Sequence, residues 1–157
     1  MQVITNRQIK NIDWEISDVV KPEDNLIFTY EYFVENRDTI LSQTGKTGII
    51  LNGEIPVDAI VSDLDDLDLI ALDFTNYVDG RCFSHARLLK DAYQYQGEIL
   101  AIGDILRDQV EHLERCGVDL IKLTDHRDTE DALKAFSELS TPYQPSQDNR
   151  ISIPQLR

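Results

Sequence analysis

Short apolar runs alternate with stretches of helical period along most of this chain, and that alternation constrains its fold more than any other feature. The runs are as long as buried strands and lie at 48–51, 69–72, 98–102 and 120–123. The helical stripes lie between and after them, at 60–67, 84–93, 106–113 and 128–139. Strands that are apolar on both faces and alternate with helices are typical of a covered parallel sheet. We therefore predict an α/β fold with a mainly parallel sheet and helices on both faces.

Periodicity does not fix the order of the strands in such a sheet. Right-handed crossovers leave two main arrangements. An open doubly wound sheet is our first prediction, and a partial βα-barrel is the alternative. The whole chain, residues 1–157, is expected to form a single domain, because no linker divides it.

The two ends of the chain have weaker patterns. Residues 1–25 are mixed in character, and we expect an N-terminal strap of uncertain structure. A helix is predicted next, with Phe33 and Ile40 on its apolar face and Gly45 as its stop. Residues 141–157 contain three prolines and are expected to be an extended or disordered tail.

The charge of the chain bears on its partners. The sequence has 29 acidic and 15 basic side chains, for a net charge of −14. Binding to nucleic acid or to an anionic membrane needs clustered lysine and arginine, so we predict neither. No apolar run approaches the ~18 residues that span a bilayer, and the first residues lack the apolar core of a signal peptide. We expect a cytoplasmic protein that meets a basic partner, and self-association is left open.

The loop after the run at 69–72 is the first candidate site. Ligands of open α/β sheets bind beyond the carboxyl ends of the strands, and this loop is long. Asp79 and Gly80 predict a tight turn with positive φ, and Ser84 is expected to be the N-cap of the next helix. Arg81 and Arg87 would then lie near a helix N-terminus, where anions are favoured. The alternative is that Arg81 only neutralises Asp79 or Asp73.

The next strand-to-helix turn is the second part of the candidate site. Gly103 lets the chain turn closely, Asp104 is expected to cap the following helix, and Arg107 and Asp108 lie in its first turn. Neighbouring strand ends would bring these groups close to Asp79 and Arg81 and create an anion or ligand site. The alternative is an ion-pair network that closes this end of the sheet.

Other motifs carry less chemistry. Cys82, near a helix N-terminus and Arg81, is a candidate reactive thiol, whereas Cys116 is expected to be a small buried apolar residue. The three histidines have no zinc-site spacing, so no metal site is predicted. The acidic run Asp63, Asp65, Asp66 and Asp68 is expected to lie on a solvated helix face. No cofactor motif is present, and a flavin is conceivable without any specific support.

The loop residues also carry a family resemblance. The residues and motifs that match are Asp79-Gly80-Arg81, Ser84, Ala86-Arg87-Leu88-Leu89, Gly97-Glu98, Gly103-Asp104, Arg107-Asp108-Gln109 and Arg115-Cys116-Gly117. In this order they resemble a bacterial family known as domain of unknown function 934. The match is dense over residues 74–119 and departs from the family pattern at Cys82 and Phe83, where Gly and Tyr are more usual.

The resemblance implies a role in assimilatory sulfate reduction, because members of the family are described as oxidoreductases involved in sulfite reduction. The residues offer ligands for neither a siroheme nor an iron–sulfur cluster, since the chain has only two cysteines. We therefore expect an accessory protein that acts with the sulfite reductase haemoprotein or its electron donor. The alternative is a small enzyme that binds an anionic metabolite at the Asp79-Gly80-Arg81 loop.

Overall fold

A computed structural model describes residues 1–76, 79–124 and 129–136. Their strands are β1 (Gln2–Thr5), β2 (Gln8–Asn11), β3 (Glu15–Ile16), β4 (Leu26–Thr29), β5 (Thr47–Asn52), β6 (Leu69–Phe74), β7 (Glu98–Gly103) and β8 (Leu120–Ile121). Their α-helices are α1 (Tyr30–Leu41), α2 (Arg81–Arg87), α3 (Val110–Arg115) and α4 (Thr129–Ala135). Two 3₁₀ helices, η1 (Val57–Asp66) and η3 (Arg107–Gln109), and one π-helix, η2 (Leu88–Ala92), complete them. The prediction for 141–157 lies outside the described residues.

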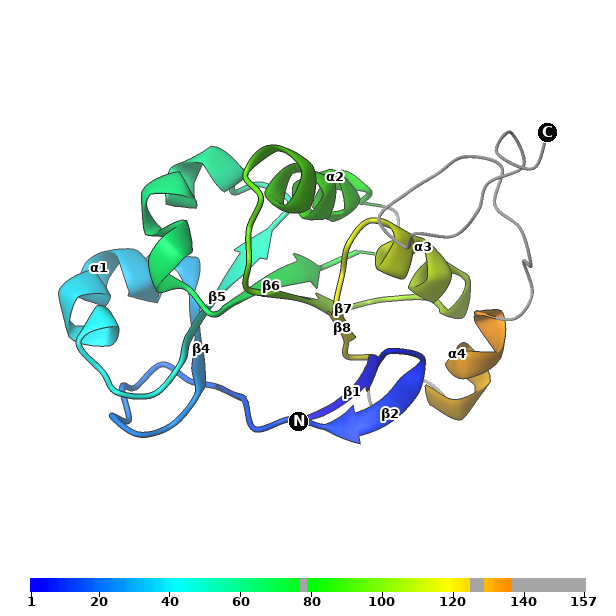
Figure 1. Ribbon diagram of the computed structural model, residues 1–157, viewed down its shortest axis with the longest axis horizontal. Coiled ribbons are helices and arrows are strands. Elements are labelled where there is room, and N and C mark those ends of the chain that lie inside the picture. The colour runs from blue at the N-terminus through cyan, green and yellow to red at the C-terminus, as the bar shows by residue number, and fades with distance from the viewer. Residues whose placement is uncertain (77–78, 125–128, 137–157) are drawn as a thin grey trace.

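The described strands form one sheet in the order β2-β1-β8-β7-β6-β5-β4-β3. Strands β3 to β8 are parallel, and β1 and β2 add antiparallel pairs at one edge. The predicted α/β fold with a mainly parallel sheet is confirmed. The parallel strands follow one another in chain order, so the described sheet lacks the reversal of a doubly wound fold, and right-handed crossovers place the intervening helices on one face. The fold is the alternative that we predicted, a partial βα-barrel (Figure 1).

The N-terminal segment shows that the sheet is curled. Strands β2 and β3 form its opposite edges, yet only residues 12–14 separate them in the chain. Four Cα–Cα steps reach at most about 14 Å, whereas the outer strands of a flat eight-stranded sheet are roughly 34 Å apart. The sheet must therefore bend until its edges approach each other. Residues 1–25 are expected to be a strap, and they instead supply both edges of the sheet and the crossing between them.

Curling gives the sheet an outer face and an inner face, each with its own apolar cluster. The outer cluster lies under the helices and includes Phe28, Phe33 and Phe74. The inner cluster fills the barrel, where Trp14 packs with Ile27, Leu69, Ala71, Leu100 and Leu120. Because residues alternate between the two faces, β1 and the strands from β4 to β8 each contribute to both clusters.

The predicted helices are present, but η1 has a different period. Helix α1 covers the predicted apolar positions Phe33 and Ile40. In η1 the buried side chains are Val57, Ile60 and Asp63, three residues apart, as a 3₁₀ helix requires. The α-helical spacing predicted that Asp63 faces solvent, and this was wrong: Asp63 is 6% exposed and accepts a hydrogen bond from Arg37 Nε on α1 at 2.6 Å. Asp65, Asp66 and Asp68 are exposed, as predicted.

Candidate functional site

The Asp79–Arg81 pair lies at the carboxyl edge of the parallel strands, beside the turn that follows β5. Arg81 Nη2 donates to Asp79 Oδ2 at 2.7 Å, and the Arg81 backbone N–H donates to Asp79 Oδ1 at 3.1 Å. Glu54 Oε1 lies 3.9 Å from the same guanidinium group. The pair packs against Gly53, where an added Cβ would come within 3.1 Å of Arg81 Nε. The alternative prediction, that Arg81 neutralises Asp79, describes this geometry.

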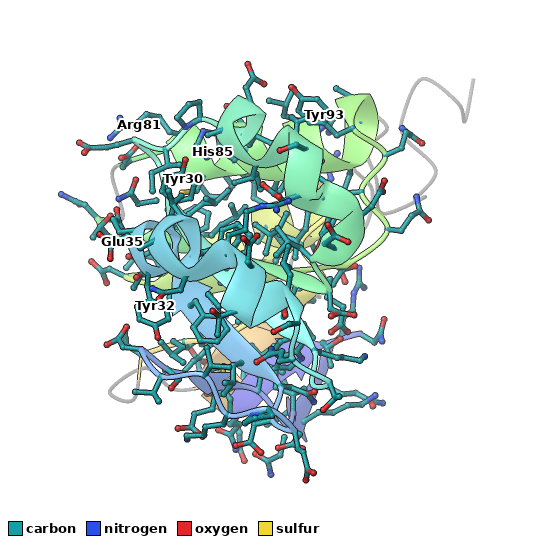
Figure 2. The ribbon with its side chains drawn as sticks, turned by 90° about the vertical axis from the view of Figure 1, so that its left-hand side faces the viewer. Tyr30, Tyr32, Glu35, Arg81, His85 and Tyr93 are labelled. Carbon is teal, nitrogen blue, oxygen red and sulfur yellow. The ribbon has the colours of Figure 1, made fainter. Side chains whose placement is uncertain are left out.

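The charges of this pair act on each other and on His85. Hydrogen bonds from Arg81 lower the pKa of the Asp79 carboxyl to about 2. Burial, together with the positive charge of Arg81, lowers the pKa of His85, which keeps the ring neutral at pH 7. The Nδ1 atom of His85 is buried and has no hydrogen-bond partner within the described residues. Figure 2 shows Arg81 and His85 together on α2, at the end of the molecule where the strands finish.

Helix α2 begins earlier than the sequence predicts. Its N-cap is Gly80 and its first residue is Arg81, so Ser84 lies inside the helix and is exposed. The prediction of Ser84 as N-cap was wrong, because the Asp79 carboxylate already holds the Arg81 N–H and starts the helix there. Gly80 has φ −83°, so the predicted positive φ is wrong as well, and nothing lies within 4 Å of where its Cβ would be.

Cys82 is a buried thiol rather than a reactive thiolate. Its side chain points from α2 toward the sheet, and Sγ donates to the backbone oxygen of Asp73 at 3.4 Å. Burial raises the pKa of Cys82 to about 12, and the charges of Asp79 and Asp73 act in the same direction. The positive charge of Arg81 lowers the pKa of Cys82, but by less than burial raises it. Cys116 is also buried, as predicted, with Sγ 3.7 Å from His112 Nε2.

The turn after β7 begins as predicted and ends differently. Gly103 has φ +102°, and an added Cβ would lie 2.5 Å from the backbone oxygen of Phe74. Asp104 does not cap a helix: burial of Ile105 keeps the chain extended to Leu106, which is the N-cap of η3. The N–H of Leu106 donates to Gln109 Oε1 at 2.9 Å. Asp108 follows in η3 and is exposed.

The three arginines of the predicted anion site contact three different carboxylates. Arg81 pairs with Asp79, as described above. Arg87, at the far end of α2, has its Nε 2.9 Å from Asp91 on η2. Arg107 Nε lies 2.9 Å from Asp131 on α4. The Arg107–Asp131 pair joins η3 to α4, whereas the other two pairs are local in the chain. The three contacts match the ion-pair alternative better than a shared anion.

Sequence reasoning did not find two residues that complete this edge. Gly53 was not among the candidates, and His85 was considered only with the other histidines as a zinc ligand. The signal for Gly53 was its place directly after β5, opposite the Asp79 loop. For His85 it was the spacing of four residues from Arg81, which places both on one side of a helix.

Among residues 1–76, 79–124 and 129–136, His, Cys, Asp and Glu form no group of three that could hold a metal ion. Over the same residues, no helix combines the length and apolar character needed to cross a membrane.

A model of a known protein family matches most of the chain. The family model described as "Bacterial protein of unknown function (DUF934)" matches residues 48–153, about two thirds of the chain. The match covers the strands from β5 onward and the whole Asp79–Arg81 region. A search of curated proteins finds no match.

Proposed function

The chain belongs to the bacterial family of proteins of unknown function called domain of unknown function 934, and on this premise we propose that it is an accessory protein of assimilatory sulfate reduction. Its partner is the sulfite reductase haemoprotein or the electron donor of that enzyme. The electrons pass from the electron donor to the haemoprotein, and this chain positions the two redox proteins. The observation that carries the proposal is a concentration of negative charge on one surface.

That surface, the acidic face, consists of the exposed acidic side chains of two neighbouring helices. They are Glu31, Glu35 and Asp38 on α1 and Asp65 and Asp66 on η1. The Arg37–Asp63 hydrogen bond joins the two helices, and Figure 2 looks onto the side with Glu35. Residues 30–80 as a whole contain eleven of the 29 acidic side chains and two of the 15 basic ones.

The acidic face also has an apolar component that suits docking. Val34 on α1 is 56% exposed and Val61 on η1 is 39% exposed. Acidic groups around apolar side chains can steer a basic partner and then give it a contact surface. Arg37 is the basic residue within this face, and its guanidinium group is held by Asp63.

The small-enzyme alternative receives less support from the geometry. An anionic metabolite at Arg81 would have to displace the Asp79 carboxylate. That carboxylate is only two residues away in the chain and forms an ion pair with Arg81 Nη2 at 2.7 Å. Cys82, the nucleophile nearest to that loop, is buried and protonated at neutral pH. The accessory role needs neither group to react.

The test is a binding experiment with a charge-matched control. The triple variant Glu31→Lys, Glu35→Lys and Asp38→Lys reverses three exposed charges on α1. The control Asp18→Lys, Glu23→Lys and Asp24→Lys makes the same change in net charge on exposed residues before β4. Biolayer interferometry against the haemoprotein and the electron donor measures association rates at about 0.05 M and 0.5 M salt, where screening differs severalfold.

We expect the α1 variant to associate at least about tenfold more slowly at low salt, and the control to change much less. Binding by the wild type should weaken as salt rises. Equal slowing of both variants would mean that net charge alone matters and would reject the acidic face. No micromolar binding of the wild type to either redox protein would reject the accessory role.

A further inference from the structure

A row of four side chains, three of them polar, crosses the inner face of the barrel at the carboxyl ends of the strands. Asn52 pairs with Asp73 in the β5–β6 register, and Asp73 pairs with Ile102 in the β6–β7 register. Ala101 pairs with Ile121 on β8, and the Lys122 N–H continues that ladder to the Ala101 oxygen. The four residues of this mouth row, Asn52, Asp73, Ile102 and Lys122, therefore lie at one level on four neighbouring strands.

Strand alternation places the mouth row above the inner apolar cluster. Ala71, two residues before Asp73, and Leu120, two residues before Lys122, are both in that cluster. Ile102 packs against it directly, as does Ile50, two residues before Asn52. The row is thus the last layer of the barrel interior. In βα-barrels this end is where substrates are bound.

The polar members of the mouth row have unused hydrogen-bonding capacity. Asn52 Oδ1 accepts the N–H groups of Glu54 and Ile55 at 2.9 and 3.1 Å, so its Nδ2 is left as a donor. Among the described residues, neither the Asp73 carboxylate nor the Lys122 ammonium group makes a side-chain hydrogen bond or ion pair. Asn52, Asp73 and Lys122 are all half-buried.

The order of these groups specifies the chemistry of a ligand. A hydroxyl group can accept from Asn52 Nδ2 and donate to Asp73, which an ammonium group cannot do, because it has no acceptor. A carbon skeleton suits the apolar side chain of Ile102, and a carboxylate suits the ammonium group of Lys122. A cavity of about 230 Å³ lies beside Lys122 at this end of β8; it is lined also by Val3, Thr124 and Thr129, and not by the other three residues of the mouth row.

From this order of groups we infer that the mouth row binds a short hydroxycarboxylic acid. Its hydroxyl lies between Asn52 and Asp73, its carbon chain lies over Ile102, and its carboxylate pairs with Lys122. Burial raises the pKa of the Asp73 carboxyl, which agrees with a group that awaits a hydrogen-bonding partner. The inference does not depend on the accessory role, because the acidic face and the barrel mouth are formed by different residues.

The experiment uses three probes that differ at one group. The ¹⁵N-labelled protein is titrated with 3-hydroxybutyrate, with butyrate, which lacks the hydroxyl, and with 3-aminobutyrate, which has an ammonium group in its place. We expect saturable shifts of the Asn52, Asp73 and Lys122 amides with 3-hydroxybutyrate, and at least about tenfold weaker binding of the other two acids, ~1.4 kcal/mol. Tighter binding of 3-aminobutyrate, or equal binding of butyrate, would overturn the assignment of the hydroxyl subsite.

Variants locate the binding. Lys122→Met and Asp73→Asn should each weaken 3-hydroxybutyrate at least about tenfold, while their spectra remain those of a folded protein. The matched control is Lys46→Met, which removes an exposed lysine just before β5, at the amino-terminal ends of the parallel strands. Affinity unchanged by both mouth-row variants, or lowered equally by Lys46→Met, would overturn the site. Should Lys122→Met fail to fold, Asp73→Asn, which preserves side-chain volume, decides the question alone.

Discussion

Two glycines in the candidate site should respond in opposite ways to the same substitution. Gly103→Ala adds a methyl group at φ +102°, only 2.5 Å from the Phe74 oxygen and 2.7 Å from Asp73 Oδ1. Gly80→Ala adds the same group at φ −83°, where nothing lies within 4 Å. The chemical change is identical, so the difference between the variants isolates backbone conformation and space.

The magnitude follows from two costs at Gly103. A non-glycine residue with positive φ costs about 1–2 kcal/mol, and forcing β6 and β7 apart to admit a methyl group costs about 1–3 kcal/mol more. Gly103→Ala should therefore lower the free energy of unfolding by about 2–5 kcal/mol and the melting temperature by roughly 5–15 °C. Gly80→Ala should leave stability unchanged or raise it by up to about 1 kcal/mol, since alanine restricts the unfolded chain.

Urea unfolding of the wild type and both variants, followed by circular dichroism, measures these changes. Unequal m-values would indicate a change in the denatured state and would call for the thermal data instead. A loss below about 1 kcal/mol for Gly103→Ala would refute the tight approach of β6 and β7 at this turn. A loss for Gly80→Ala as large as that for Gly103→Ala would refute the helical conformation at the start of α2.

Four further predictions concern single side chains. Iodoacetamide at pH 8 should leave Cys82 unmodified in the native protein and alkylate it in urea, as mass spectrometry can show, because burial raises its pKa to about 12; rapid native alkylation would contradict this. Because the folded pKa of Asp79 is depressed to about 2, its stabilising effect is present above the unfolded value and is lost as pH falls through the folded value. Asp79→Asn should therefore destabilise the protein at pH 7 and have a much smaller effect near pH 2. The lowered pKa of His85 likewise gives stability that is present at pH 7 and lost below the unfolded value, so His85→Gln should flatten the fall in stability from pH 7 to pH 5. Trp14→Ala should cost about 3–5 kcal/mol in a urea titration, because Trp14 is 8% exposed within the barrel; a cost below about 1 kcal/mol would mean that the barrel interior is not closed by this side chain.

The candidate site was only partly predictable. The positions of Asp79 and Arg81 after a strand were clear from the sequence, because a βα loop must follow the apolar run of β6. Asp79 and Asp91 are close in the chain to Arg81 and Arg87, so those two pairs were within reach of sequence reasoning, whereas the partner of Arg107 was not. Asp131 is 24 residues from Arg107, and its contact depends on where α4 packs. The mouth row likewise needs the strand register, which local periodicity does not contain.

The sequence by itself determined the number and type of most elements from β5 onward, because apolar periodicity reflects which side chains each element must bury. It also determined the acidic character of the chain, which is a matter of composition. Only the tertiary structure decided that the sheet curls, that the first 16 residues supply both of its edges, and that Asp63 and Cys82 are buried. These features arise from pairing between strands and helices distant in the chain, whose energies depend on three-dimensional contact rather than on neighbouring residues.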